Sequence, residues 1–207
     1  VNMDTTGLEA LRDMFGPNRY ELKFYPAPGS ERTPFALVCP GGGYACVMSC
    51  IEGKPIAKAL NERGYSVFVL RYRCRERARY PSPLIDIANA VKEILAHADC
   101  YRVDPQNYAV FGFSAGGHLA AMYGVKALGW GKFALPRPTV LVLSYPVITL
   151  GEKTHAGSRD NLLGKHPAHD AIQRCSVEKQ VTADYPPTFL WCGDADKTVD
   201  PDNSRML

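Results

Sequence analysis

The stretch YAVFGFSAGGHLAA (residues 108–121) decides how this chain folds. Its first half is apolar and aromatic, as in a buried strand, and its second half consists mostly of small residues that suit a tightly packed helix. We therefore expect a strand over Tyr108–Phe113 that turns directly into a helix over Ala115–Leu128.

The junction between these two elements, Gly112–Gly116, matches the pattern GxSxG. The pattern alone is a weak signal because glycine and serine are common residues. Its position between a strand and a helix makes it specific, since a chain that turns so sharply needs small residues on both sides of the serine and exposes the hydroxyl. Ser114 is thus predicted to be a catalytic nucleophile; the alternative is a serine that only caps the following helix.

Short apolar runs alternate with helical patterns on both sides of this stretch. Such an order predicts an α/β fold with a doubly wound, mostly parallel sheet and helices on both faces. The later strands are apolar throughout, as expected of strands covered on both faces. The expected strands are Tyr20–Tyr25, Phe35–Cys39, Tyr65–Leu70, Tyr108–Phe113, Val140–Tyr145 and Thr188–Cys192, and the expected helices are Pro55–Arg63, Leu84–His97 and Ala115–Leu128.

A glycine-rich loop, PGGGY (residues 40–44), follows the second expected strand. Acyl transfer creates a tetrahedral oxyanion that needs preorganised N–H donors. A triple glycine lets backbone N–H groups approach a substrate closely. We predict that Gly42, Gly43 and Ala115 form this oxyanion hole and that Gly41 sets the turn; an ordinary glycine turn is the alternative.

The length and composition suit one globular domain over residues 1–207. A formal net charge of +3 gives no reason to expect nucleic acid as a partner. Five arginines alternate with other residues over 71–79; we interpret this segment as a solvated loop, with an anion-binding stripe as the alternative. No phosphate-binding pattern and no zinc-ligand spacing are present, so we expect neither an organic cofactor nor a metal.

No apolar run is long enough to cross a bilayer, and no secretory signal is visible at the start of the chain. The seven cysteines are scattered and odd in number, which favours reduced thiols and a cytoplasmic location. Because residue 1 is Val, removal of a signal peptide is left open.

The sequence resembles the esterase/lipase-type α/β hydrolases, in particular the small bacterial acetylxylan-esterase-like and feruloyl-esterase-like branch. Pro40 departs from this resemblance, because many members carry a His there that props the glycine loop. The segments that carry the resemblance are CPGGGY (39–44), LRYR (70–73), YPSPLIDIANAV (80–91), DPQNYAVFGFSAGGHLAA (104–121), SYPVIT (144–149) and PPTFLWCGDADKTVDPDNS (186–204).

The resemblance implies a catalytic triad in the order Ser, acid, His. The family pattern of the acid loop, Gly-x-x-Asp-x-x-Val, falls on Gly193, Asp196 and Val199, so Asp196 is the predicted acid. Asp194 is the alternative and is expected to act as a turn residue. Asp200 is expected to start or cap the next helix.

No histidine follows Asp196 in the sequence. We therefore expect that the chain as given is C-terminally incomplete, that it lacks the final strand and helix of the fold, and that the catalytic His lies beyond Leu207. His118 is expected to be a packing residue. His155 and two further histidines fall in residues 150–180, which we expect to form a lid or acyl-pocket insertion.

The function that these features favour is that of a serine carboxylesterase. It would cleave small-molecule esters with a short acyl group, such as acetyl groups on carbohydrate, through an acyl-enzyme on Ser114. One alternative is a peptidase or arylformamidase of the same fold, and another is a catalytically incomplete binding protein. No membrane partner is expected, a homo-oligomer is left open, and the sequence does not specify the natural substrate.

Overall fold

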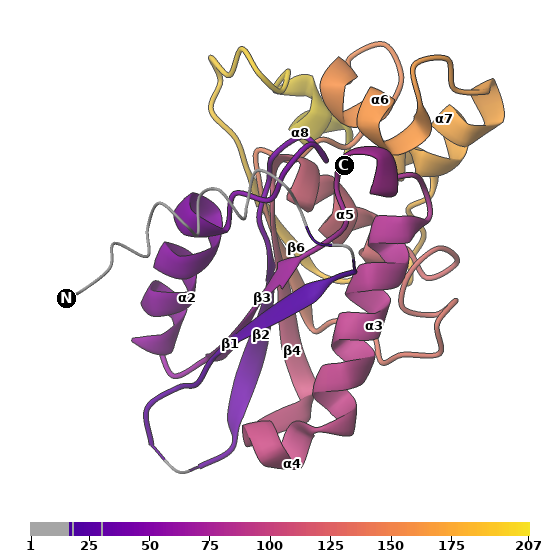
Figure 1. Cartoon of the computed structure of the whole chain (residues 1–207). Coiled ribbons are helices and arrows are strands. Elements are labelled where there is room, and N and C mark those ends of the chain that lie inside the picture. Colours follow the sequence, from indigo (N-terminus) through magenta and orange to yellow (C-terminus); the bar gives the residue numbers. More distant parts are fainter. Residues whose placement is uncertain (1–16, 18, 30) are drawn as a thin grey trace.

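The computed structural model of the chain describes residue 17 and residues 19–29 and 31–207 (Figure 1). Its strands are β1 (Glu21–Tyr25), β2 (Thr33–Cys39), β3 (Ser66–Arg71), β4 (Val103–Phe113), β5 (Val140–Ser144) and β6 (Thr188–Trp191). Its longer helices are α2 (Lys54–Asn61), α3 (Ser82–Ala96), α5 (Ser114–Gly124), α6 (Ala156–Leu163) and α7 (His169–Cys175). The shorter helical segments are η1 (Ser49–Gly53), η2 (Arg75–Arg77), α4 (Ala98–Tyr101), η3 (Val177–Lys179) and α8 (Asp202–Met206).

The six described strands form one sheet in the order β1-β3-β2-β4-β5-β6. β1 pairs antiparallel with β3, and every other pairing is parallel. The sheet is therefore mostly parallel, as the sequence predicts. The chain leaves β2 towards β3 on one side and later returns to place β4 on the other side. The strand order therefore reverses at β2 and β4, and the loops that follow these two strands diverge at the same edge of the sheet, where ligands bind in such folds.

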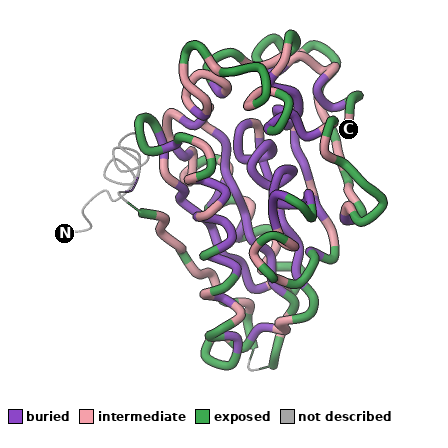
Figure 2. The backbone as a smooth tube through the Cα atoms, turned by 90° about the vertical axis from the view of Figure 1, so that its right-hand side faces the viewer, coloured by how far each residue is buried: buried purple, intermediate pink, exposed green. Residues whose placement is uncertain are grey.

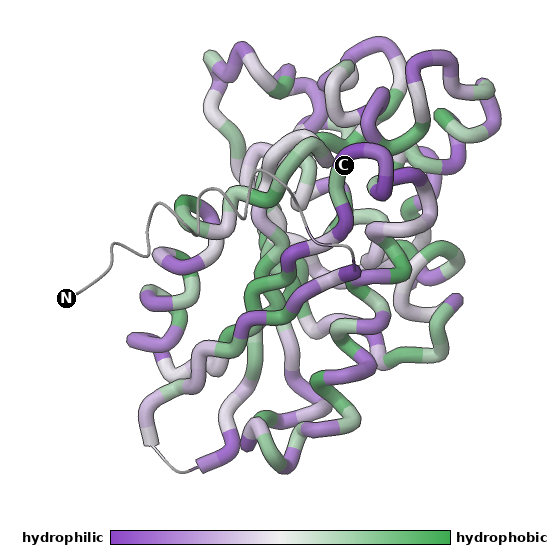
Figure 3. The backbone as a smooth tube through the Cα atoms, viewed as in Figure 1, coloured by the Kyte–Doolittle hydropathy of each residue, from purple (hydrophilic) through white to green (hydrophobic). Residues whose placement is uncertain are grey.

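Helices cover both faces of the sheet, α2 on one side and α3 and α5 on the other (Figure 1). The residues of β2 alternate accordingly: Ala36 and Val38 pack in the smaller core with Ala57 of α2, whereas Phe35 and Leu37 belong to the larger core with α3 and α5. The central strands and the inner sides of the helices are buried and apolar, while the outer loops are exposed and hydrophilic (Figures 2 and 3).

Two element boundaries differ from the sequence prediction by more than two residues. β4 begins at Val103 instead of Tyr108, because Val103 pairs with Thr33 before a register shift. The four residues that follow Val103 are three polar residues and a proline, which gave no strand pattern in the sequence. The helix that begins at Ser114 ends at Gly124 instead of Leu128, since Val125 adopts an extended conformation.

β6 corrects the expectation that all later strands are covered on both faces. It lies at the edge of the sheet, and its residues alternate between partly buried and exposed. Phe189 and Trp191 are 61% and 48% exposed, respectively, on the same face of this strand. Among the described helices, none is long and apolar enough to cross a membrane.

The arginine-rich segment is a second correction, because three of its arginines hold structural elements together. The side chain of Arg71 is nearly buried and pairs at 2.8 Å with Glu21, its cross-strand partner on β1. Arg73 forms a 2.8 Å ion pair with the buried Asp86 of α3. Arg79 donates to the carbonyls of Asp160 and Asn161 near the end of α6. The charges of Arg71 and Arg73 are thus paired within the fold, whereas the other three arginines of the segment are exposed, as the solvated-loop interpretation expects.

The approach of α5 to β2 generates a prediction about stability. A Cβ added to Gly116 would lie 2.1 Å from the carbonyl oxygen of Cys39 and 2.3 Å from that of Pro40. Both are backbone atoms, so Gly116→Ala forces the helix away from the sheet and is expected to lower the free energy of unfolding by about 1–3 kcal/mol or more. Urea denaturation followed by circular dichroism measures the change.

The matched control is Gly193→Ala, because an added Cβ there meets no atom within 4 Å and the φ angle is ordinary. This variant is expected to stay within about 0.5 kcal/mol of the wild type. Equal stabilities of the two variants would contradict the packing described for α5.

Candidate active site

Ser114 lies at the sharp turn from β4 into α5. Its φ of +51° is in the left-handed region, which a non-glycine residue adopts only when the surrounding structure imposes it. The neighbouring small residues are required by contact: a Cβ on Gly112 would lie 2.6 Å from the carbonyl oxygen of Gly116 and 2.7 Å from the Cβ of Ala120. The backbone therefore holds Ser114 at the carboxyl edge of the sheet, at the N-terminus of an 11-residue helix.

The glycine loop after β2 packs directly against this turn. A Cβ on Gly41 would lie 2.9 Å from both the Cβ of Ser114 and the carbonyl oxygen of Phe113. Gly42 and Gly43 both have positive φ, +126° and +63°, a conformation that favours glycine at each position. The structure thus brings the predicted nucleophile and the predicted oxyanion loop together.

The three glycines of the loop differ in whether their N–H groups are already hydrogen-bonded within the protein. The N–H of Gly41 donates to the Glu52 carboxylate at 2.6 Å and is unavailable to a substrate. Within the described residues, the N–H groups of Gly42 and Gly43 have no acceptor, and Ala115 lies in the first helical turn, where N–H groups lack intrahelical partners. Gly42, Gly43 and Ala115 are therefore the available donors, and their role as the oxyanion hole stays a prediction.

His118 is a structural residue, as expected from the sequence. It is fully buried; its Nε2 lies 2.8 Å from the carbonyl oxygen of Cys175 and its Nδ1 lies 2.8 Å from the hydroxyl of Tyr44. A carbonyl only accepts, so Nε2 carries the proton and Nδ1 accepts from the tyrosine. Burial lowers the pKa of His118 to about 4, against the weaker opposing effect of the bond to Cys175. Both ring nitrogens are occupied, which leaves neither for Ser114.

His155 lies beside the glycine loop, since a Cβ on Gly43 would be 3.6 Å from its Cε1. It caps helix α6: its Nδ1 accepts from the backbone N–H of Ser158 at 3.2 Å and lies 2.8 Å from the hydroxyl of the same residue. Because Nδ1 accepts, the proton of the neutral ring is on Nε2. A general base needs a free ring lone pair, and the one lone pair of this tautomer, on Nδ1, is engaged by Ser158, so His155 is not placed to act as the base.

The acid loop after β6 distinguishes its aspartates. Asp196 Oδ1 accepts from the N–H groups of Thr198 and Val199 at 2.8 and 3.0 Å, which fixes the carboxylate and leaves Oδ2 without a donor among the described residues. Asp194 is 97% exposed at its side chain and lies 3.9 Å from Arg205. Asp200 accepts from the N–H of Asp202, the first residue of α8, at 3.0 Å, but the N-cap residue of this helix is Pro201, so Asp200 lies just before the cap position that was predicted for it.

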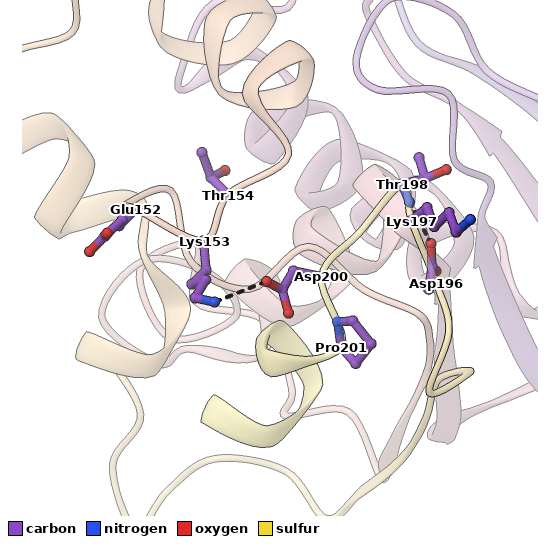
Figure 4. A pocket seen from close by; sticks show the side chains of 8 residues that line it. All are labelled: Glu152, Lys153, Thr154, Asp196, Lys197, Thr198, Asp200 and Pro201. Carbon is purple, nitrogen blue, oxygen red and sulfur yellow. Dashed lines mark hydrogen bonds and ion pairs between the residues drawn. The ribbon is translucent and has the colours of Figure 1, made fainter.

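Asp196 follows the carboxyl end of β6, at the same edge of the sheet as Ser114. Its charge contributes to raising the pKa of Tyr145, after the larger effects of burial and of Glu52. The ring of Tyr145 in turn packs 6.1 Å from that of Phe113, the residue before Ser114. Asp196 also lines an open polar cavity of about 450 Å³ (Figure 4). The other residues that line the cavity are Glu152, Lys153, Thr154, Lys197, Thr198, Asp200 and Pro201.

The insertion predicted over residues 150–180 reaches the site through α6. The Asn161 side chain donates to the carbonyl oxygen of Gly43 at 2.9 Å. His155 and Asn161 thus frame one side of the oxyanion loop, while a lid function of the insertion stays a prediction.

Sequence reasoning missed two side chains of the site, Glu52 and Tyr145. Tyr145 directly follows β5, so its position at a carboxyl strand end was a usable signal. Glu52 lies in η1, just before α2, where an acidic residue is ordinary and gave no signal.

A mostly parallel α/β sheet, a strained serine between strand and helix, and a glycine loop packed against it are the features of the α/β-hydrolase fold. The family model described as BD-FAE matches residues 23–129, and the one described as Prolyl oligopeptidase family matches residues 82–207. The chain therefore belongs to the α/β-hydrolase family that both models describe.

Known relatives agree with this assignment. The chain is 38% identical over 181 residues to "Endo-1,4-beta-xylanase B" of Butyrivibrio fibrisolvens, a match that spans 83% of this chain and 28% of the relative. It is 30% identical over 164 residues to "Acetylxylan esterase" of Xylanibacter ruminicola, spanning 77% of this chain and 33% of the relative. The chain thus spans about a third or less of the length of these curated relatives.

Among solved structures, the acetyl ester-xyloside bifunctional hydrolase from Caldicellulosiruptor lactoaceticus superimposes with a TM-score of 0.84 at 34% identity. The match covers 99% of this chain and 77% of that one. The fold described above is therefore that of an α/β hydrolase of this group.

The contrast between the aspartates gives a prediction for activity. Asp196→Asn keeps an oxygen for the N–H groups of Thr198 and Val199 but removes the charge that stabilises an imidazolium. We expect kcat for p-nitrophenyl acetate to fall by about 10³–10⁴-fold at neutral pH. Asp194→Asn is the matched control and should stay within about twofold of the wild type, because surface substitutions away from such contacts have small effects. The reverse ranking would assign the acid to Asp194.

The burial of His118 gives a prediction for pH dependence. Its pKa is about 4 in the folded protein against its usual 6.5, so between these values the unfolded state binds a proton that the folded state does not. The free energy of unfolding therefore falls as the pH is lowered through this window, by roughly 2 kcal/mol between pH 7.5 and pH 5.0. His118→Gln removes this titration and should show a flatter profile, although it is less stable at pH 7.5. Urea midpoints at both pH values measure the effect, and parallel profiles would contradict it.

Proposed function

We propose that the protein is a carboxylesterase that hydrolyses short acyl esters, in particular acetyl esters of carbohydrates. The observation that carries this proposal is the strained Ser114 packed against a glycine loop whose second and third N–H groups are available as donors. This arrangement suits a reaction in which a hydroxyl attacks a carbonyl and negative charge develops on the carbonyl oxygen.

In the proposed reaction the Ser114 oxygen forms a bond to the ester carbonyl carbon while a histidine accepts the hydroxyl proton. The tetrahedral oxyanion receives hydrogen bonds from the N–H groups of Gly42, Gly43 and Ala115. The ester C–O bond then breaks, and the alcohol leaves with the proton from the histidine. Water next gives a proton to the same histidine and attacks the acyl carbon. The bond to the Ser114 oxygen breaks, and this oxygen takes the proton back from the histidine. Asp196 holds the histidine in the tautomer that accepts the proton.

Carbohydrate as the alcohol is supported by the relatives and by the cavity beside Asp196. The named relatives comprise an acetylxylan esterase, a xylanase and an acetyl ester-xyloside hydrolase. The cavity is lined almost entirely by charged and hydroxyl-bearing side chains, which suit a polar leaving group such as a sugar (Figure 4). A small-molecule ester is therefore the substrate class that we propose.

The peptidase alternative has less support. The prolyl oligopeptidase match covers residues 82–207, which carry the nucleophile turn and the acid loop. Esterases and peptidases of this fold share both features, so the match does not favour peptides over esters.

A cytoplasmic location is part of the proposal. All seven cysteines are free thiols, and Cys39, Cys74 and Cys175 are buried. Reduced, buried cysteines suit a reducing compartment. Fractionation of the native organism, with antibody detection, tests this location.

The test of the activity uses the natural full-length protein and its Ser114→Ala variant. The variant removes the attacking oxygen, so kcat for p-nitrophenyl acetate and for acetylated xylo-oligosaccharides is expected to fall by about 10⁴–10⁶-fold. Labelling by a fluorophosphonate should disappear as well. Ser82→Ala, at the first residue of α3, is the matched control and should leave both readouts unchanged.

Two outcomes would contradict the proposal. Retention of more than about a tenth of kcat by Ser114→Ala would exclude the serine as nucleophile, since loss of a triad member costs far more. Faster turnover of proline-containing peptides than of acetyl esters by the wild type would favour the peptidase instead.

A further inference from the structure

Glu52 occupies a position in the site that the proposed chemistry does not explain. Its carboxylate accepts two hydrogen bonds, from the N–H of Gly41 at 2.6 Å and from the hydroxyl of Tyr145 at 2.9 Å. Gly41 belongs to the oxyanion loop after β2, and Tyr145 directly follows β5. One side chain therefore links the carboxyl ends of two strands that are not neighbours in the sheet.

Tyr145 is itself firmly held. Its φ is +39°, its N–H donates to the carbonyl oxygen of Trp191 at 2.7 Å, and its ring meets that of Trp191 edge-on at 5.5 Å. Burial, with the charge of Glu52 as the next cause, raises the pKa of Tyr145, so its hydroxyl stays protonated and donates. The tyrosine hydroxyl thus has a fixed position, and its hydrogen bond orients the carboxylate of Glu52 towards the Gly41 N–H.

Gly41 fits tightly between Glu52 and the nucleophile turn. A Cβ at this residue would lie 2.9 Å from Oε2 of Glu52 and 2.9 Å from the Cβ of Ser114. The carbonyl of Gly41 accepts from the N–H of Met48 at 3.0 Å, and the carbonyl of Pro40 accepts from the Tyr72 hydroxyl at 2.7 Å. These two hydrogen bonds fix the carbonyl groups of Pro40 and Gly41, and Glu52 fixes the N–H of Gly41.

We propose that Glu52, fixed by Tyr145, is the positioning residue of the oxyanion loop. It engages the Gly41 N–H and thereby sets where the N–H groups of Gly42 and Gly43 lie relative to Ser114. Pro40 has no polar side chain that could hold this loop, whereas Glu52 holds it through the N–H of Gly41. The inference rests on the proposed esterase function, because an oxyanion hole matters only if an oxyanion forms.

A role for Glu52 in positioning the loop predicts a particular pattern of kinetic change. Oxyanion donors act mainly in the transition state, so a displaced loop lowers kcat and leaves substrate binding nearly intact. A side chain that served only packing would instead change stability, and any loss of activity would follow the loss of folded protein. The two roles therefore differ in the relation between kcat, KM and affinity for a transition-state mimic.

The experiment compares Glu52→Ala, Glu52→Gln and Tyr145→Phe in the natural full-length protein. Glu52→Ala frees the loop and is expected to lower kcat for p-nitrophenyl acetate by about 10–100-fold with KM changed less than about twofold. Glu52→Gln keeps an oxygen for Gly41 and an N–H for the tyrosine oxygen, so it should recover to within about threefold of the wild type. Tyr145→Phe removes only the hydroxyl and should lower kcat by about 3–10-fold. Glu62→Ala, an exposed acid after α2, is the control and should match the wild type.

A second readout is the inhibition constant of an aryl trifluoromethyl ketone, which forms a tetrahedral adduct with the serine. Across the series its affinity should fall in proportion to kcat/KM, as expected for a mimic of the transition state. Glu52→Ala with the kinetics of Glu62→Ala would overturn the inference. A rise in KM without loss of ketone affinity, or no recovery in Glu52→Gln, would also overturn it.

Two further comparisons keep the test decisive. If Glu52→Ala does not fold, the other two variants still test the inference, because Tyr145→Phe is expected to lower kcat by about 3–10-fold and Glu52→Gln to stay within about threefold of the wild type. Activity that survives in Ser114→Ala would refute the proposed function itself, an outcome that the Glu52 variants alone cannot produce.

Discussion

The close approach of the β4–α5 turn to the end of β2 is the constraint on which the rest of this structure depends. Gly112 pairs with Cys39, and Gly116 lies so near the carbonyls of Cys39 and Pro40 that no side chain fits. This contact brings the serine turn and the glycine loop to one point, where the strand order reverses. The positions of the predicted nucleophile, of its predicted oxyanion donors and of the helix N-terminus therefore follow from one backbone packing arrangement.

The site stores strain that the core must sustain. Ser114, Tyr44 and Tyr145 all have positive φ, at a cost of about 1–3 kcal/mol each. Tyr44 is buried and bonded to His118, and Tyr145 is held by Glu52 and Trp191. Each of these two strained tyrosines thus has specific side-chain partners. A rigid loop and a rigid serine suit an enzyme whose catalysis depends on donors already in place when charge develops.

Polar side chains in this protein mostly serve to join elements that are distant in the sequence. Arg71, Arg73 and Arg79 fasten β1, α3 and α6, and Asn161 fastens α6 to the oxyanion loop. Their charges and amides are satisfied within the protein, as expected for partly buried groups. The cavity beside Asp196 is also polar, and there Lys153 pairs with Asp200 at 3.3 Å, which joins the insertion to the start of α8.

The sequence by itself determined the alternation of strands and helices, the GxSxG turn and the glycine loop. Its resemblance to the esterase family added Asp196 as the candidate acid. These features are local: a sharp turn needs small residues within five positions, and a buried strand needs a short apolar run. Only the tertiary structure revealed that Glu52 takes the N–H of Gly41, that His118 and His155 have tautomers unsuited to a base, and that β6 has an exposed face. Glu52 and Tyr145 are 93 positions apart, and His118 and Cys175 are 57 apart, so no local pattern records their contacts. The sheet order sets which strand ends meet, and with them the partners of every polar group at the site.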